Sequence, residues 1–306
     1  DAVNTPNDPI LLPSLEIVSL SILPGGILNG GAETLTINGS NAAWRSEGTL
    51  NPGTSNVIFT NALATISGIT DFYDITIDTN AGLSLKSNSI VRIGGTITKN
   101  SGGHFHTVED GNTTVEYNGG NQTVIVPNTA SNRYYNLILS GTGVKTMPSQ
   151  ALDIVGSFVV SGLASTSAAA SLTISEDIFI DEGATFNTGS YDHILEGDFE
   201  NYGTFNATST QSLTLAGNSS QNILGEAPTN FTNLVIDNSE GVNLYLNGYV
   251  NEILTLSTGN LIVNDAVLGI NGTISKTGGQ ISVSDLSTLS FGGSSALTLN
   301  ADLFSE

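Results

Sequence analysis

The chain is predicted to be an all-β protein that folds as a parallel β-helix, or β-solenoid, with coils of roughly 20 residues. Three observations predict this class. The composition is rich in residues that form turns, short apolar segments alternate with polar ones, and related segments are separated by distances that differ by about one coil.

The composition favours strands and turns over long helices. The 306 residues include 35 Gly and no Cys, and the polar share is dominated by Ser, Thr and Asn. Charged residues make up 11% of the chain, against roughly a quarter of an average domain. Because Gly, Ser and Asn suit turns and Thr suits strands, this mixture predicts many short strands.

Internal repeats indicate coils that are added or removed as whole units. One motif of six residues occurs at 72–77, 134–139 and 231–236. It reads aromatic, any residue, Asp or Asn, aliphatic, any residue, aliphatic. Short strands that enter an Asn/Gly/Ser turn begin at Val57, Val115, Leu213 and Leu289. The intervals between these four positions are unequal, and they differ from one another by about 20 residues or by about twice that length, as whole inserted coils would produce. A solenoid tolerates such insertions, whereas an array of β-sandwiches needs domains of fixed strand order.

The strand pattern agrees with a solenoid along the whole chain. Alternating segments such as 83–85, 178–180 and 254–256 are separated by clusters of Gly, Asn, Ser and Thr. The best helical candidate, residues 162–171, is too short and too rich in Ser and Thr to stand alone. We expect parallel pairing between coils, inward aliphatic side chains at alternate positions, and a right-handed coil.

The two ends are expected to differ from the middle. Residues 1–31 are predicted to form an extended arm or cap, and residues 32–306 the solenoid. The apolar residues Leu15, Ile17, Leu20 and Ile22 are expected to cover the first coil, and the alternatives are docking on another copy by strand addition or a linker. Leu297 and Leu299 lie in the last coil, which shows no cap. We expect this coil to be covered by another copy, in a head-to-tail polymer, or by a downstream part of a longer chain.

The recurring motifs follow one another in a fixed order: a strand, an Asn/Gly/Ser turn with Gln, the segment aromatic-x-Asn-Leu-x-Ile, and Gly-Val. This order resembles repeats of large secreted surface proteins and adhesins of Bacteroidota-type bacteria. The resemblance covers about residues 51–304 through the motifs given above. It implies a β-solenoid with an extracellular, cell-surface location. The C-terminal sorting domain usual in that family is not recognisable in the sequence.

Charge and composition exclude several functions. A net charge of −21, with 7 Lys and Arg against 28 Asp and Glu, argues against nucleic-acid binding, which needs basic residues. No apolar run of the length of a membrane span is present, so membrane insertion is not expected. β-Helix enzymes that cleave acidic polysaccharides need Asp clustered with Arg or Lys. Here the basic residues are scattered, and we expect no enzymatic activity.

One acidic segment is a candidate metal site. A coil of about 19 residues would stack Asp177 over Glu196 and Asp181 over Glu200. Stacked carboxylates repel each other unless a cation or a proton relieves them, and calcium prefers several oxygen ligands. The alternative is a solvated acidic face, and no other cofactor is expected. The pair His104 and His106 has a spacing that suits a transition metal, but a solvent-facing strand explains it as well.

These patterns predict a structural extracellular scaffold, a rigid stalk or fibre subunit at a bacterial surface. The alternative is a carbohydrate-binding adhesin module with surface glycans as partners. Adjacent aromatic residues of the recurring motif are candidates for a sugar-stacking face, although alternation along a strand places one of each pair in the core.

Overall fold

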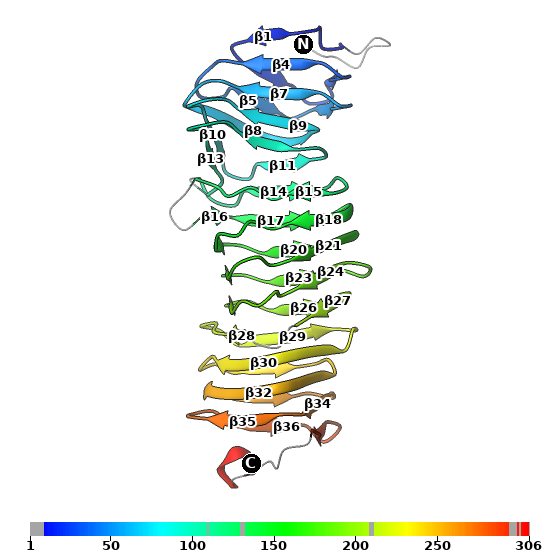
Figure 1. Ribbon diagram of the computed structural model, residues 1–306, viewed down its shortest axis with the longest axis vertical. Helices are drawn as coiled ribbons and strands as arrows, with labels where there is room; N and C mark the ends of the chain where they lie inside the picture. The colour runs from blue at the N-terminus through cyan, green and yellow to red at the C-terminus, as the bar shows by residue number, and fades with distance from the viewer. Residues whose placement is uncertain are drawn as a thin grey trace. The chain divides into compact units, whose positions relative to one another are not determined.

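The structure is a computed structural model that describes residues 9–108, 110–128, 132–207, 211–293, 299 and 301–305 (Figure 1). The chain forms two compact units, residues 1–146 (unit 1) and 147–306 (unit 2). The described residues contain one helix, the short 3-10 helix η1 (Ala301–Leu303), and otherwise only strands. Strands in each unit pair in parallel with the strand one coil away, which confirms the predicted parallel β-solenoid.

Unit 1 stacks its strands in columns. The first column contains β1 (Leu15–Ile17), β4 (Thr34–Ile37), β7 (Asn56–Phe59), β9 (Asp74–Ile77) and β12 (Ile97–Lys99). The second contains β2 (Leu20–Ile22), β5 (Trp44–Ser46), the first part of β8 (Ala64–Phe72), β10 (Gly82–Leu85) and β13 (His104–His106). The third contains the second part of β8, β11 (Ile90–Ile93), β14 (Thr114–Tyr117) and β17 (Asn136–Leu139), and the pair β3 (Ile27–Asn29) and β6 (Thr49–Asn51) forms a separate two-stranded sheet. The remaining strands are β15 (Gln122–Thr123), β16 (Arg133–Tyr134) and β18 (Thr142–Thr146).

Unit 2 repeats this arrangement. One column contains β20 (Phe158–Val160), β23 (Ile178–Ile180), β26 (Phe199–Asn201), β29 (Gln221–Gly225), β31 (Val242–Leu244), β33 (Leu261–Val263) and β36 (Ile281–Val283). A second column contains β19 (Leu152–Ile154), β22 (Leu172–Ile174), β25 (His193–Leu195) and β28 (Ser212–Leu215). A third contains β21 (Leu163–Ser167), β24 (Thr185–Asn187) and β27 (Thr204–Asn206). Both lead to the long strand β30 (Thr229–Asp237), followed by β32 (Gly248–Thr258), β34 (Val267–Ile270), β35 (Thr273–Lys276) and β37 (Thr288–Phe291).

The register gives the coil length directly. Leu35 pairs with Leu15 of the preceding coil and with Val57 of the following one. In unit 2, Ile178 pairs with Phe158 before it and with Phe199 after it. These partners stand roughly 20 to 22 residues apart along the chain, which is the predicted coil length. The length varies because strands must stay aligned while corners tolerate extra residues.

Inward side chains form the core of each unit. In the first column of unit 1 the stacked residues Leu35, Val57, Ile75 and Ile97 are all buried. Unit 2 adds an aromatic group in which the rings of Phe199 and Phe205 lie 5.0 Å apart and those of Phe199 and Phe231 lie 5.7 Å apart. Such aromatic pairs stabilise a core by about 0.5–1.5 kcal/mol each beyond area burial.

The recurring aromatic motif contributes to this core as expected. Phe72, Tyr134 and Phe231 are buried, while the adjacent Tyr73 and Tyr135 are partly exposed. The prediction that one aromatic of each pair points inward is therefore confirmed.

The first coil begins within the segment that was expected as an arm or cap. Strands β1, β2 and β3 lie within residues 15–29 and pair with β4, β5 and β6 of the next coil. Ahead of them, Ile10 pairs with Asn29 and Leu11 is buried. Strand pairing thus starts at Leu15, ahead of the expected solenoid boundary at residue 32.

Candidate functional site

The acidic segment of unit 2 is aligned differently from the expectation. Phe179 pairs with Glu200, so the coil between them is longer than the short coil that the sequence suggested. Asp177 consequently lies against Asp198, and the Asp198 backbone N–H donates to Asp177 Oδ1 at 2.8 Å. The predicted stacks of Asp177 over Glu196 and Asp181 over Glu200 are wrong, because the corners between β23 and β26 hold more residues than the short-coil estimate allowed.

The carboxylates of this segment connect coils through the backbone. Asp198 repeats the role of Asp177: its Oδ1 accepts the Asn222 backbone N–H at 2.7 Å, and its Oδ2 accepts Asn222 Nδ2 at 3.0 Å. Among the described residues, no group of three or more His, Cys, Asp or Glu side chains is arranged to hold a metal ion. Calcium binding by Asp177, Asp181, Glu196 and Glu200 and its alternative, a solvated acidic face, both stay predictions.

A cleft of about 650 Å³ opens beside this segment on the surface of unit 2. It is lined by Phe179, Asp181, Glu182, Tyr202, Glu226 and Ala227. Phe179 is the middle residue of β23, whose other two residues are buried, so its ring faces outward. The next coil places Tyr202 beside it through the hydrogen bond from the Tyr202 backbone N–H to the Ile180 carbonyl, 2.8 Å long. The third coil contributes Ala227, whose N–H donates to the Asn201 carbonyl at 3.2 Å.

The geometry of the cleft combines aromatic and acidic groups. The ring centroids of Phe179 and Tyr202 are 5.5 Å apart with an interplanar angle of 41°, and Tyr202 is 37% exposed. Glu182 and Glu226 are exposed, whereas Phe179 and Asp181 are half-buried. Phe179 is therefore less exposed than the two glutamates, whereas Tyr202 is exposed as they are. This pairing was not predicted from the sequence, because only the observed register brings Phe179 and Tyr202 together.

The electrostatic field around the cleft is negative. Residues 147–306 contain 17 Asp and Glu and a single basic residue, Lys276, which pairs with Asp302 at 3.0 Å. Burial raises the pKa of Glu200, and the negative charges of Asp177 and Asp198 raise it further, while a hydrogen bond from Tyr202 opposes the shift. An anionic ligand would meet repulsion here.

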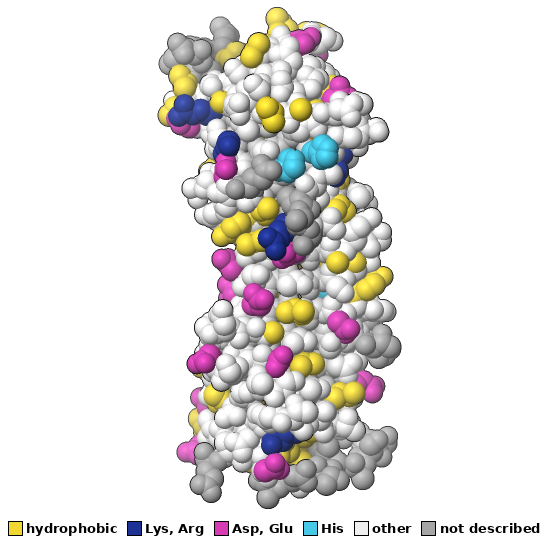
Figure 2. Space-filling view, turned by 90° about the vertical axis from the view of Figure 1, so that its left-hand side faces the viewer, with side chains coloured by type: hydrophobic (Ala, Val, Ile, Leu, Met, Phe, Trp, Pro, Cys, Tyr) yellow, Lys and Arg dark blue, Asp and Glu magenta, His cyan; other side chains and the backbone are white. Residues whose placement is uncertain are grey.

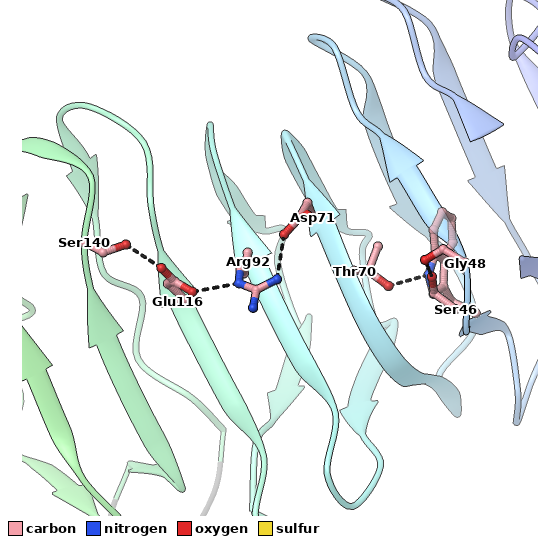
Figure 3. Close-up of polar contacts among 8 residues, drawn as sticks. Ser46, Gly48, Thr70, Asp71, Arg92, Glu116 and Ser140 are labelled. Carbon is pink, nitrogen blue, oxygen red and sulfur yellow. Dashed lines mark hydrogen bonds and ion pairs between the residues drawn. The ribbon is translucent and has the colours of Figure 1, made fainter. Parts of the chain in front are cut away.

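Unit 1 carries a different polar arrangement on its outward face (Figure 3). Asp71, Arg92 and Glu116 lie directly opposite one another on β8, β11 and β14. Arg92 Nη1 lies 3.2 Å from Asp71 Oδ1, and its Nε lies 2.9 Å from Glu116 Oε2. Ser140 Oγ donates to Glu116 Oε1 at 2.5 Å. Alternating charges in register stabilise strand alignment, with each partly exposed pair contributing about 1 kcal/mol or less.

Two buried glutamines, Gln122 and Gln221 (the corner glutamines), explain the turn motif found in the sequence. Gln122 Oε1 accepts the Gly119 backbone N–H at 2.8 Å, and its Nε2 donates to the Ile93 and Gly95 carbonyls of the previous coil at 2.7 and 2.8 Å. Gln221 makes the corresponding bonds with Gly217, Leu195 and Gly197. Each amide therefore satisfies backbone groups of two coils at a buried corner.

The corner of Gln122 also contains a buried lysine. Lys145 is fully buried, and its Nζ donates to the Gly119 and Gly120 carbonyls, each at 2.8 Å, and to Gln122 Oε1 at 2.6 Å. Burial lowers the pKa of Lys145 to about 8, with the charge of Glu116 acting in the opposite direction. The ammonium group supplies donors that this corner needs.

His104 and His106 lie side by side on β13. Their rings are nearly parallel, with centroids 5.9 Å apart and an interplanar angle of 9°. Phe105 between them is buried, so both imidazoles point outward as the sequence predicted.

On the face drawn in Figure 2, charged side chains are scattered and most of the surface is neither charged nor hydrophobic.

The candidate assembly residues lie in terminal coils. Leu15, Ile17 and Leu20 are half-buried in β1 and β2, and Ile22 is buried. In the described part of the chain, β1 and β2 each pair on one side only, with β4 and β5. Leu299 is 45% exposed, and Leu297 lies outside the described residues.

Comparisons of the chain with protein-family models, with curated proteins and with solved structures found no match. Within the residues that the structure describes, no helix has the length and apolar character of a membrane span. The fold and site define a class: a parallel β-solenoid that carries an acidic, aromatic-lined cleft on unit 2.

Proposed function

We propose that the chain is a structural scaffold at a bacterial surface, a rigid stalk or fibre subunit. The observation that carries this proposal is the register within each unit, where backbone hydrogen bonds join coil to coil and aliphatic residues stack on aliphatic residues. Polar side chains continue the connection outside the core, as in the pair Asn187 and Asn206, whose amides lie 2.8 Å apart. A body built this way resists local opening because each inner coil is bonded on both sides.

The scaffold proposal is tested by removing one coil. Leu268 pairs with Gly248, and Ile281 pairs with Leu261, with the same separation along the chain in both pairs. Deleting residues 248–267 therefore places Leu268 where Gly248 lay and keeps the register. We expect this variant to fold and to remain accessible to antibodies on intact producing cells, because a scaffold depends on stacking and on no particular coil.

A matched deletion of half this coil, residues 248–257, provides the control. It shifts every later strand out of register, and we expect the coils after residue 247 to lose their strand pairing and the melting temperature of unit 2 to fall, while the full-coil deletion melts like the intact chain. Antibody labelling that appears only after cell lysis contradicts a surface scaffold. So does a full-coil deletion that folds normally yet abolishes whatever phenotype deletion of the whole protein produces.

Head-to-tail association of copies is the second part of this proposal. The outer edges of β1 and β2 present backbone groups of the kind that accept another strand, and apolar side chains such as Val18, 67% exposed, lie beside them. Among the last strands of unit 2, Leu286 is 79% exposed and Phe291 is 43% exposed. Contacts between unlike ends generate open filaments.

Sedimentation at rising protein concentration tests the association. The variant Val18→Lys is expected to shift the equilibrium toward monomer, because it places a charge in the proposed contact. Leu163→Lys is the matched control, since Leu163 is also 67% exposed but lies on β21 in unit 2. A protein that stays monomeric at every concentration, or variants that behave alike, contradicts the head-to-tail contact.

A further inference from the structure

The cleft around Phe179 and Tyr202 has the chemistry of a small-molecule site. Two neighbouring rings offer apolar faces on which a flat C–H surface or a cation packs favourably. Asp181, Glu182 and Glu226 line the same cleft. An ionised carboxylate accepts hydrogen bonds and donates none. A ligand that fits this lining must therefore present an apolar face together with several donors.

The charge around the cleft restricts the class of ligand that can bind there. Asp177, Asp198 and Glu200 add negative charge beside the cleft, and the one basic residue of residues 147–306, Lys276, is paired with Asp302. Positive charge on the ligand relieves this repulsion, whereas carboxylate, sulfate or phosphate groups increase it.

The arrangement of the lining favours a sugar over a lysine-rich peptide. Sugar rings combine a C–H face with hydroxyl and amino donors spread around the ring edge. In the cleft, half-buried Phe179 faces outward, and the exposed Glu182 and Glu226 stand at the rim from two different coils. A lysine side chain instead carries all its donors on one flexible tip, so a peptide needs several lysines, each ordered separately, to make the contacts that one rigid sugar chain makes.

We propose that the cleft of unit 2 binds an oligosaccharide that carries free amino groups, with Phe179 and Tyr202 packing against sugar rings and Asp181, Glu182 and Glu226 accepting hydrogen bonds from its amino and hydroxyl groups. This binding activity does not depend on the scaffold proposal, and it gives a specific place to the carbohydrate-binding alternative that the sequence left open.

The test is calorimetric titration of the full chain with a β-1,4-linked glucosamine oligomer at a pH where its amines are protonated. We expect binding that Tyr202→Ala weakens about tenfold, equivalent to about 1.4 kcal/mol. The double variant Glu182→Gln/Glu226→Gln is expected to weaken binding as well. Tyr245→Ala and Glu252→Gln are matched controls, because both residues are exposed on unit 2 outside the cleft lining.

Each remaining outcome counts against the proposal. No heat of binding, or equal affinity in the cleft variants and the controls, overturns the site. Equal affinity for the N-acetylated oligomer overturns the requirement for amino groups. A pentalysine peptide that binds as tightly as the sugar, with the same dependence on the two glutamates, overturns the assignment to carbohydrate in favour of general cation attraction. Thermal melts of all variants establish that they are folded, since the substituted residues are exposed.

Discussion

Single buried polar side chains connect successive coils, and two of them, Lys145 and His193, titrate. Gln122 and Gln221 show how one residue type satisfies backbone groups of two coils at once. The donor to the Gln oxygen differs between the two corners: Lys145 donates to Gln122, whereas Asn238 Nδ2 donates to Gln221 at 2.8 Å. The corner thus requires a hydrogen-bond donor rather than a particular residue. The glutamine therefore recurs in the turn motif, whereas the donor residue differs between copies.

Lys145→Met is expected to destabilise unit 1 by about 2 kcal/mol, because the Gly119 and Gly120 carbonyls and Gln122 Oε1 each lose the hydrogen bond from the buried ammonium group. Urea unfolding measures the change. Lys86→Met is the control, since Lys86 is half-exposed and its ion pair with Asp110 lies at the surface; we expect a cost of about 1 kcal/mol or less. Equal costs for the two variants contradict the role of the buried ammonium group.

His193 makes the stability of unit 2 dependent on pH. Its Nδ1 accepts the Leu172 backbone N–H at 3.1 Å, and its Nε2 lies 2.8 Å from the Thr188 carbonyl, so the neutral ring with a proton on Nε2 satisfies both contacts. Burial lowers the pKa of His193 below 6.5, and the Thr188 carbonyl and Asp192 oppose the shift. The unfolded chain therefore takes up the proton first as the pH falls, and stability decreases below pH 6.5.

Unfolding free energies measured on both sides of pH 6.5 test this dependence. In His193→Gln the decrease over this range is expected to shrink, because the titrating group is gone. His104→Gln removes an exposed histidine of unit 1 and is expected to leave the decrease unchanged. A His193→Gln variant with the full wild-type pH dependence shows that another group is responsible.

At the scale of the strand and its corner, backbone stacking decides which residues are tolerated. Asp74, Asp192 and Asn247 each accept a backbone N–H of the next coil, from Thr96, Ser212 and Val267. These side chains align coils just as the strand hydrogen bonds do. The sequence predicted the strands well, because alternation is a local property, but it misjudged the register at Asp177, which depends on how residues are distributed in the corners.

Gly259→Ala tests the close stacking of corners. Gly259 has a φ of 69°, and a Cβ there would overlap the Asn238 carbonyl oxygen of the neighbouring coil. We expect a loss of at least about 2 kcal/mol, because the added carbon strains the backbone and pushes neighbouring coils apart. Gly120→Ala is the control, since a Cβ at Gly120 meets no atom within 4 Å. Thermal melts that shift equally for both variants contradict this account.

At the scale of the whole molecule, charge is distributed unevenly between the two units. Residues 1–146 contain 11 Asp and Glu with 6 Lys and Arg, whereas residues 147–306 contain 17 Asp and Glu with one Lys. Self-repulsion is therefore concentrated in unit 2, where a folded stack of coils holds like charges close together.

Sodium chloride is expected to raise the melting temperature, because salt screens this repulsion. Calcium chloride at the same ionic strength is expected to give the same increase, since Asp177 and Asp198 already accept backbone hydrogen bonds. Differential scanning calorimetry in the two salts makes the comparison. Extra stabilisation by calcium that disappears in Asp177→Asn contradicts this expectation and indicates a calcium site. A melting temperature that does not respond to sodium chloride contradicts the importance of self-repulsion.

The sequence alone determined the class of fold, because hydrophobic alternation and the insertion of whole coils can both be recognised from the sequence. It also predicted that one aromatic of each recurring pair lies in the core, and the structure shows that this residue is Phe72 in one pair and Tyr134 in the other. Only the tertiary structure decided which residues meet between coils. Slightly longer corners place Asp177 against Asp198 instead of Glu196 and bring Phe179 beside Tyr202. The physical reason is that side-chain proximity in a solenoid depends on the summed length of strands and corners, and corner length carries no local sequence signal.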